Sequence, residues 1–275
     1  MTIRTYLSFL GRSPDFARLW LAQVVSLLGD WFSTIVLSAL VVRYSPGNEG
    51  LAVSGLLMAR FIPPMLISPA AGALVDRFDR KRLLIWSNLL RAAVVLGFLA
   101  TTDNPGLLWL IYFLSVLQFT LSAIFEPGQS ALIPNVVRRD DLVIANTLVT
   151  ITWSVMLALG AVVGGVVATL FGARTALLID ALTFVIAAAL IAAIRSYKGN
   201  AEAQGTAPAD TSIREGLRFV RRRPDVGAVL LVKFGNSIGN IDTLMTIYAT
   251  QVFVLGADGQ LSLGIMYSAF GVGAI

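Results

Sequence analysis

The sequence predicts an all-α membrane protein, as its composition, its long apolar segments and the placement of its basic residues all indicate. The chain has 275 residues, of which 56% are hydrophobic and 13% are charged, whereas soluble domains carry about 25% charged residues. It contains neither cysteine nor histidine, which excludes disulfides, thiolate or imidazole metal ligands and histidine proton relays. We therefore expect no metal and no cofactor, and any proton coupling must use carboxylates.

Apolar runs long enough to cross a membrane, about 20 residues each, recur along the whole chain. We expect spans at residues 16–42, 51–75, 83–101, 107–126, 142–171, 174–195 and 226–254. An eighth begins near Leu261, but the 15 residues that remain to Ile275 are too few to cross at ~1.5 Å per residue. The sequence therefore has the pattern of a C-terminally truncated chain.

Prolines distinguish two of these spans. In the second span, Pro63, Pro64 and Pro69 predict a bend. The fourth span is expected to end with the segment Glu126-Pro127-Gly128, because proline and glycine interrupt helices.

Lysine and arginine residues gather in the loops on one side of the expected spans. Of the 21 such residues, only Arg43 and Arg174 fall in loops on the other side, and three lie within spans. By the positive-inside rule, this asymmetry predicts a cytoplasmic N-terminus. The cytoplasmic set consists of Arg4, Arg12, Arg18, Arg77, Arg80, Lys81, Arg82, Arg138, Arg139, Arg195, Lys198, Arg214, Arg218, Arg221, Arg222 and Arg223.

The turn at residues 72–82, between the second and third spans, places four basic residues close to a glycine and two aspartates. Its spacing, Gly-x-Leu-x-Asp-Arg-x-x-Arg-Lys-Arg, resembles the loop between helices 2 and 3 of major facilitator superfamily transporters. In that superfamily the loop is a latch that favours one conformation of the transport cycle; a plain positive-inside loop is the alternative. The residues to which the resemblance assigns this conformational switch are Gly72, Asp76, Arg77, Arg80, Lys81 and Glu126.

Two positions of the motif, and one residue at the end of the fourth span, carry separate expectations. Gly72 would let the end of the second span approach a neighbouring helix closely. Glu126, near the inner surface, would pair with Arg77 or Arg80, or else be a helix-terminal charge in water. Asp79 stands where the general motif has glycine, as in the subgroup resembling enterobactin-exporter-like and macrolide-efflux-like proton antiporters.

A run of small residues in the fifth span forms a second motif. Gly160, Gly164 and Gly165 lie on a face suited to close helix packing. The run resembles the Gly-Pro-x-x-Gly-Gly signature of facilitator antiporters, with Ala161 in place of proline. Ordinary helix packing is the alternative to an antiporter motif.

The long loop at residues 196–225 is expected to face the cytoplasm. Its segment 212–215, Ser-Ile-Arg-Glu, is typical of a capping box, and Ile213, Leu217 and Val220 fall on one helical face. We expect an amphipathic helix on the inner leaflet, with a solvated basic linker as the alternative.

A weak internal repeat relates the first and seventh spans. A shift of 210 residues aligns segment 12–51 with segment 222–261 in the same orientation. Parallel repeats of six helices are typical of the two facilitator halves. We therefore divide the chain into an N-terminal six-helix half at 1–195, a central loop with an amphipathic helix at 196–225, and the incomplete start of a C-terminal half at 226–275.

Six charged residues fall within the expected spans, where a charge is costly and is a functional candidate by default. Asp30 and Arg60 lie at similar expected depths, roughly 22–24 Å from the cytoplasmic end at ~1.5 Å per residue, and are expected to pair. Asp30 is then either a proton acceptor whose pKa is tuned by burial and by Arg60 or half of a static ion pair. The proton-coupling and transport candidates are Asp30, Arg60, Arg91, Asp180, Lys233 and Asp242, of which Arg91 and Lys233 are expected to lie nearer the inner surface.

The resemblance implies a major-facilitator-type helical bundle and a secondary active transporter rather than an enzyme. It would export a small amphipathic molecule, such as a drug, a macrolide or a siderophore-like compound, by proton-coupled alternating access. It would be a multi-pass protein of the bacterial inner membrane and a monomer when full length. No GxxxxGK[ST] motif is present, and the basic residues fit membrane orientation better than nucleic-acid binding.

Two other interpretations remain open at this point. In the first, the chain is a transport-inactive fragment of such an exporter, because alternating access requires two halves. Alternatively, it is a seven-helix retinal protein that uses Lys233, since a lysine in the seventh span accompanies intramembrane aspartates.

Overall fold

The structure, a computed structural model, describes residues 3–195, 218, 220–223, 225–228 and 242–273, and within these it contains helices and no strand. The all-α fold class is therefore confirmed. The helices of the first part are α1 (Ile3–Arg12), α2 (Pro14–Arg43), α3 (Glu49–Arg77), α4 (Arg80–Phe98), α5 (Leu108–Val136) and α6 (Leu142–Ala192). Short 3₁₀ turns η1 (Leu99–Thr101), η2 (Pro105–Leu107) and η3 (Arg139–Asp141) connect them.

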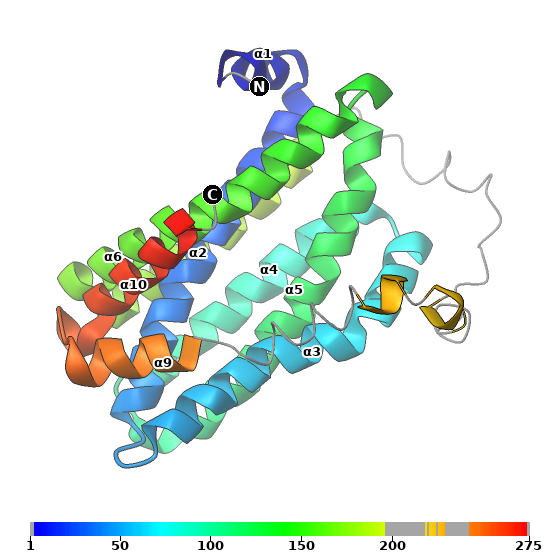
Figure 1. Cartoon of the computed structure of the whole chain (residues 1–275). Helices are drawn as coiled ribbons and strands as arrows, with labels where there is room; N and C mark the ends of the chain where they lie inside the picture. The colour runs from blue at the N-terminus through cyan, green and yellow to red at the C-terminus, as the bar shows by residue number, and fades with distance from the viewer. Residues whose placement is uncertain (1–2, 196–217, 219, 224, 229–241, 274–275) are drawn as a thin grey trace.

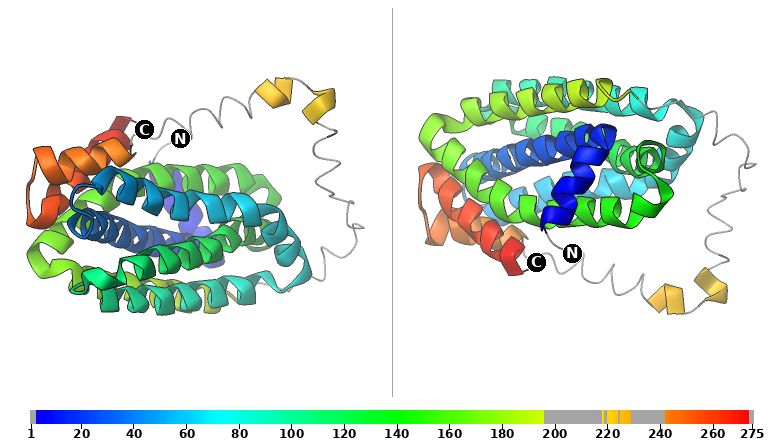
Figure 2. Two further views of the ribbon diagram at one scale, coloured as in Figure 1. Left: turned by 90° about the horizontal axis from the view of Figure 1, so that it is seen from below. Right: turned by 90° about the horizontal axis from the view of Figure 1, so that it is seen from above.

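The last described residues, 242–273, form a helical hairpin whose second helix packs on α6 and whose first helix lies against α3. It consists of α9 (Asp242–Ile247), the π-helical turn η5 (Tyr248–Val252), the 3₁₀ turn η6 (Ala257–Gly259) and α10 (Gln260–Gly273). Figure 2 shows in both views that α9 and α10 lie at one side of the bundle.

The long element α6 contains two helices that fold back on each other. Gly172 interrupts it with φ 83° and ψ 165°, a conformation that glycine adopts without steric cost. In Figure 1 the chain reverses at this point, which confirms the expected division between residues 171 and 174. Five described elements, including this double one, are long and apolar enough to cross a membrane.

One additional helix and one helix end differ from the prediction. α1 was not expected; its Phe9 packs against Phe16 of α2 with ring centroids 5.0 Å apart. α5 does not end at Glu126 but continues through Pro127 and Pro134 to Val136. Pro127 removes the hydrogen bond to the Ala123 carbonyl, and membrane helices tolerate such a loss beside a cavity, where other groups satisfy the backbone.

One end of the bundle, here called the basic end, holds the turn between α3 and α4. Contacts at this end join several helices. Lys81 Nζ donates to the Ile194 carbonyl over 2.7 Å, and the Arg195 amide donates to Asp15 Oδ1 over 3.1 Å. The starts of α2 and α4 therefore lie level with the end of α6. α3 and α5, which alternate with these helices along the chain, run in the opposite direction.

The opposite end, here called the loop end, is held by a second set of contacts. The Tyr44 hydroxyl donates to the carbonyls of Thr101 and Thr102 at 2.9 and 2.6 Å, and Arg174 pairs with Asp103 at 2.7 Å. Burial raises the pKa of Tyr44, so this hydroxyl keeps its proton, and remains a donor, at neutral pH.

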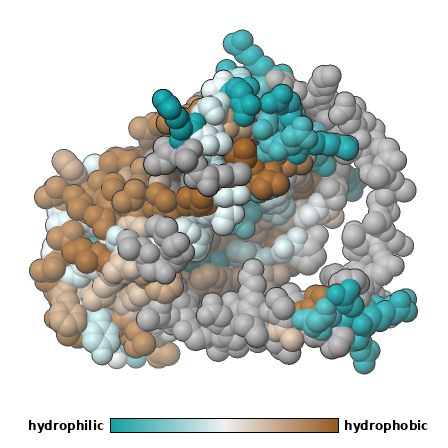
Figure 3. Space-filling view, turned by 45° about the horizontal axis from the view of Figure 1, so that its top comes forward, coloured by the Kyte–Doolittle hydropathy of each residue, from teal (hydrophilic) through white to brown (hydrophobic). Residues whose placement is uncertain are grey.

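Two apolar clusters fill the interior, and a polar layer separates them. One cluster, near the loop end, includes Phe32, Phe98 and Leu177; the other, near the basic end, includes Phe16 and Leu84. Between them lie buried polar side chains of α2, α4, α5 and α6, namely Gln23, Ser26, Ser33, Ser87, Asn88, Arg91, Ser115, Gln118, Asp180 and Thr183. Large apolar side chains also cover the exterior (Figure 3), as expected for helices that face lipid.

Candidate functional site

The centre of the polar layer is an ion pair between α2 and α4. Arg91 Nη2 lies 2.7 Å from both Oδ1 and Oδ2 of Asp30. The Arg91 side chain is 2% exposed, whereas that of Asp30 is 21% exposed. The guanidinium carbon of Arg91 also lies 4.1 Å from the ring centroid of Phe184, a cation–π distance. A buried cation therefore holds a carboxylate that remains accessible from a cavity.

Asp180, on the returning part of α6, is a second carboxylate close to this pair. It is fully buried, accepts a hydrogen bond from the Ser33 hydroxyl, and lies near enough for the charges of Asp30 and Arg91 to act on it. Gly29 makes this approach of α2 and α6 possible, because a Cβ there would overlap Asp180 Oδ1 and Thr183 Oγ1. Asp180 Oδ1 has no hydrogen-bond partner within the described part of the chain.

Asp30 and Arg60 do not form the expected pair. Arg60 Nη1 donates to Thr34 Oγ1 over 3.2 Å, and its guanidinium lies 5.1 Å from the Phe119 ring centroid. Side chains lean toward the N-terminus of their own helix, so Asp30 on α2 and Arg60 on antiparallel α3 lean apart. α4 runs parallel to α2, so Arg91 and Asp30 lean the same way. This contact places the Arg91 guanidinium at the level of the Asp30 carboxylate.

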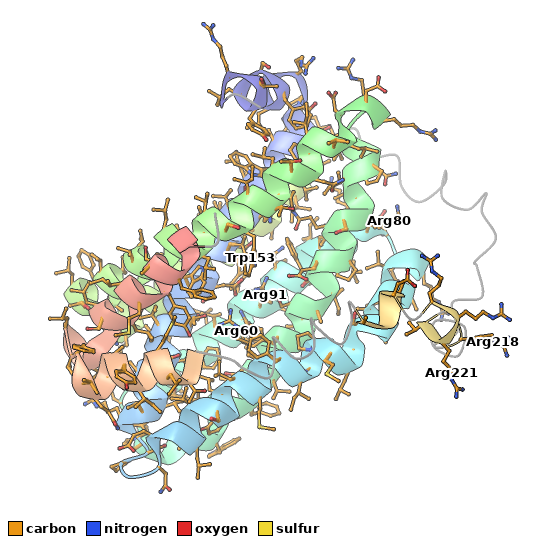
Figure 4. The ribbon with its side chains drawn as sticks, in the orientation of Figure 1. Arg60, Arg80, Arg91, Trp153, Arg218 and Arg221 are labelled. Atoms are coloured by element: carbon orange, nitrogen blue, oxygen red, sulfur yellow. The ribbon has the colours of Figure 1, made fainter. Side chains whose placement is uncertain are left out.

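A cavity of about 280 Å³, here called the main cavity, opens beside this pair between α2, α3, α5 and α6. Its wall combines three charged side chains with aromatic and aliphatic ones. The lining residues are Leu27, Asp30, Trp31, Arg60, Phe61, Pro64, Phe119, Ser122, Ala123, Glu126, Trp153 and Leu157. Figure 4 shows Arg60, Arg91 and Trp153 within the bundle, while Arg218 and Arg221 project away from it.

A narrower cavity of about 30 Å³ adjoins the main one and shares Asp30, Arg60 and Phe119 with it. Gln118 lines it, is 3% exposed, and has no partner for either amide atom within the described residues. A volume of this size holds about one or two waters. Asp30 therefore lines both cavities.

Glu126 lies in the main cavity rather than at the basic turn where it was expected. Arg80 Nη1 instead donates to the Ala131 carbonyl and to Asn135 Oδ1, at 3.1 and 3.2 Å. Glu126 leans toward the start of α5, away from the turn. Arg80 and Lys81 thus hold carbonyls near the ends of α5 and α6, where basic side chains are favourable.

The other predicted switch and transport residues take no part in the contacts described so far. A Cβ at Gly72 meets no atom within 4 Å, so the close approach expected there has no counterpart among the described residues. Arg77 is exposed at the end of α3. The side chains of Asp76 and Asp242, the whole of Lys233 and the expected capping box at 212–215 lie outside the described residues.

The glycines of the second motif allow two different helices to pack closely against α6. A Cβ on Gly160 would lie 2.5 Å from Trp31 Cδ1, and one on Gly164 3.1 Å from the Trp31 carbonyl, so these glycines receive α2. A Cβ on Gly165 would lie 2.7 Å from the Gln260 carbonyl, and Gly264 of α10 packs at the same place. The expected close packing is therefore present, on two sides of α6.

Several cavity residues were not predicted as site residues. Thr34, Gln118, Phe119 and Trp153 belong to apolar or mixed runs with no motif of their own. A polar residue inside a span, such as Gln118, is the one available signal, whereas aromatic lining residues resemble any lipid-facing residue in sequence.

Comparison with known proteins agrees with this architecture. The profile of the transmembrane secretion effector family of the major facilitator superfamily matches residues 8–275. The chain is 29% identical over 210 residues to the uncharacterised MFS-type transporter YfiS of Bacillus subtilis, covering 74% of this chain and 48% of that protein. It is 26% identical to the putative bacilysin exporter BacE of Bacillus amyloliquefaciens, covering 76% and 51%.

A third relative is macrolide efflux protein A of Streptococcus pyogenes, 27% identical over 227 residues, with 79% of this chain and 54% of that protein covered. The chain thus spans about half the length of the curated relatives that it matches. Since the family profile covers nearly the whole chain and the described residues form apolar membrane-length helices, the chain is an integral membrane protein of the transmembrane secretion effector family of major facilitator transporters.

Proposed function

We propose that the protein is a secondary active transporter that exports a small amphipathic molecule in exchange for protons, by alternating access. The observation that carries the proposal is the ion pair of a cavity-exposed Asp30 with a buried Arg91. The names of two relatives, the putative bacilysin exporter BacE and macrolide efflux protein A, support the direction of transport. The substrate would be a small drug-, macrolide- or siderophore-like compound.

In this proposal Asp30 accepts the coupling proton. Protonation removes the charge that Arg91 neutralises, and the guanidinium is left with Asp180 and Phe184 as its remaining electrostatic neighbours. The protonated and deprotonated states of Asp30 thus favour different positions of Arg91 between α2 and α6. A charge change at one residue then biases a two-state packing arrangement, as secondary transport requires.

The proposal includes the surroundings of the protein. Basic residues such as Arg80, Lys81 and Arg139 lie at the basic end, so we place this end and the N-terminus in the cytoplasm, in the inner membrane of a bacterium. The proposed partners are the exported molecule, the proton and the lipid bilayer, and the full-length protein would act as a monomer. The boundaries at 195 and 225 between the six-helix half, the central loop and the second half stay predictions.

Proton movement in everted membrane vesicles tests this function. Addition of erythromycin or ethidium to vesicles that hold a proton gradient should dissipate part of that gradient through the wild-type protein. Asp30→Asn should abolish the response, because an amide does not take up a coupling proton, while Asp103→Asn at the exposed loop end should preserve it. A response that Asp30→Asn leaves intact would refute the role of Asp30.

The same assay separates transport from the alternative of a transport-inactive chain. If neither compound moves protons through the wild-type protein, while the protein is present in the membrane and folded, the inactive interpretation is favoured. The retinal interpretation rests on Lys233, which lies outside the described residues, and an absorbance spectrum of the purified protein tests it.

A further inference from the structure

The charges of the main cavity are unequally satisfied, and this distinguishes one cation and one anion. Asp30 is neutralised by Arg91 at 2.7 Å. Arg60 lines the same cavity and donates to a neutral hydroxyl, that of Thr34. Glu126 also lines it and is exposed there. Within the described residues, neither Arg60 nor Glu126 has an oppositely charged side chain within 4.0 Å.

The spacing of these two charges is that of a small molecule. The Arg60 guanidinium lies over Phe119, which precedes Glu126 by two helical turns, or roughly 10 Å along α5. The Phe119 and Glu126 side chains both lean toward the helix N-terminus, so the gap keeps this length, and contacts of about 3 Å at each end take up part of it. A ligand placed between them therefore needs its own two charges only a few ångströms apart.

The wall between the two charges is aromatic and aliphatic. Phe61, Phe119, Trp153 and Leu157 line it, and a mostly apolar pocket with a few convergent polar groups is typical of a ligand site. Beside such a wall, the two unpaired charges leave room for a ligand that carries the opposite charges.

We propose that the main cavity binds an amphipathic zwitterion, whose carboxylate contacts Arg60, whose ammonium group contacts Glu126, and whose apolar body packs on Phe119 and Trp153. This deepens the proposed function by naming the charge class of the exported molecule, and it rests on that function for the site's role in export. It assigns Arg60 and Glu126 to substrate recognition and leaves Asp30, already paired, to the proton.

Calorimetric titration of the full chain in detergent at neutral pH tests the proposal with four probes that share one apolar body. These are the dipeptide Ala-Phe, its C-terminal amide, its N-acetyl derivative and its doubly blocked N-acetyl amide. Since a hydrogen bond to a charged group is worth about a tenfold change in affinity or more, Ala-Phe should bind at least about tenfold more tightly than either singly blocked probe. The doubly blocked probe should bind most weakly.

Two variants assign each charge to its partner. Arg60→Gln should weaken only the probes that carry a carboxylate, about tenfold, and leave the C-terminal amide unchanged. Glu126→Gln should weaken only the probes that carry an ammonium group. Arg139→Gln and Asp140→Asn, which make the same charge changes at exposed positions of η3, should change no affinity.

Four equal affinities, no binding of Ala-Phe, or an equal loss for all probes in Arg60→Gln would overturn the zwitterion site. Because binding is measured without a proton gradient, its outcome is separate from that of the vesicle assay. A missing charge pattern with Asp30-dependent proton movement removes the zwitterion proposal alone. The expected charge pattern without proton movement, when Ala-Phe itself is added to the vesicles, removes the transport proposal alone.

Discussion

Arg91 shows how burial changes the free energy that is lost when an ion pair is broken. Its bond to Asp30 and the exposed bond of Arg174 to Asp103 have the same 2.7 Å separation. The Arg91 side chain is 2% exposed, whereas that of Arg174 is 68% exposed. Breaking a buried pair leaves an uncompensated charge in a medium of low dielectric constant, while an exposed pair is screened by water.

Arg91→Met should therefore lower the free energy of unfolding by about 3–5 kcal/mol. Arg174→Met should lower it by at most about 1 kcal/mol. Denaturant unfolding of both variants in one detergent measures the difference. Arg91→Met combined with Asp30→Asn should recover much of the loss, since the stranded carboxylate is then neutral, and similar losses in the two single variants would contradict this account.

At the scale of elements, glycines determine how closely the helices of the bundle approach. Gly165 faces the backbone of α10, whereas Gly72, in the turn motif, faces open space among the described residues. The two glycines therefore have different roles, although both belong to small-residue motifs in the sequence.

Gly165→Ala should lower the free energy of unfolding by about 1–3 kcal/mol, because its methyl group would press on the Gln260 carbonyl. Gly72→Ala should be neutral or stabilise by up to about 1 kcal/mol, because alanine is the better helix former. Thermal unfolding in detergent distinguishes the two. A Gly72→Ala variant as unstable as Gly165→Ala would show that α3 packs closely on something at that point.

At the scale of the whole molecule, the contacts at the two ends define a direction across the membrane. The basic end carries Lys81 and Arg139, and the loop end carries Asp103 and Arg174. The absence of cysteine from the chain means that a single introduced cysteine reports on one end without background.

Asp103→Cys should react with a membrane-impermeant maleimide in intact cells, whereas Arg139→Cys should react only after the membrane is permeabilised. This follows from the positive-inside rule applied to the two ends. Labelled fractions on a gel measure it. The reverse pattern would place the N-terminus outside, and labelling of both variants in intact cells would indicate a mixed orientation.

Sequence patterns predicted most of the helical segments but fewer of the contacts between them. The break near Gly172, a turn within 72–82 and the packing face at Gly164 were all predictable, because each depends on local residue types. α1 and the extension of α5 past Pro127 were not, since tertiary contacts stabilise them against weak or opposing local signals. In the site, Asp30 and Arg91 were both found as candidates but were not paired with each other.

The sequence by itself determined the membrane class, the motif that resembles facilitator transporters and most helix boundaries to within a few residues, apart from α1 and the end of α5. This is possible because a bilayer requires each span to satisfy its own backbone, which makes apolar length and flanking charge decisive. Only the tertiary structure decided that Asp30 meets Arg91 and that Arg60 and Glu126 share a cavity. Those contacts depend on which helices lie side by side and on how each is rotated about its axis, and neither follows from the depth of a residue along its span.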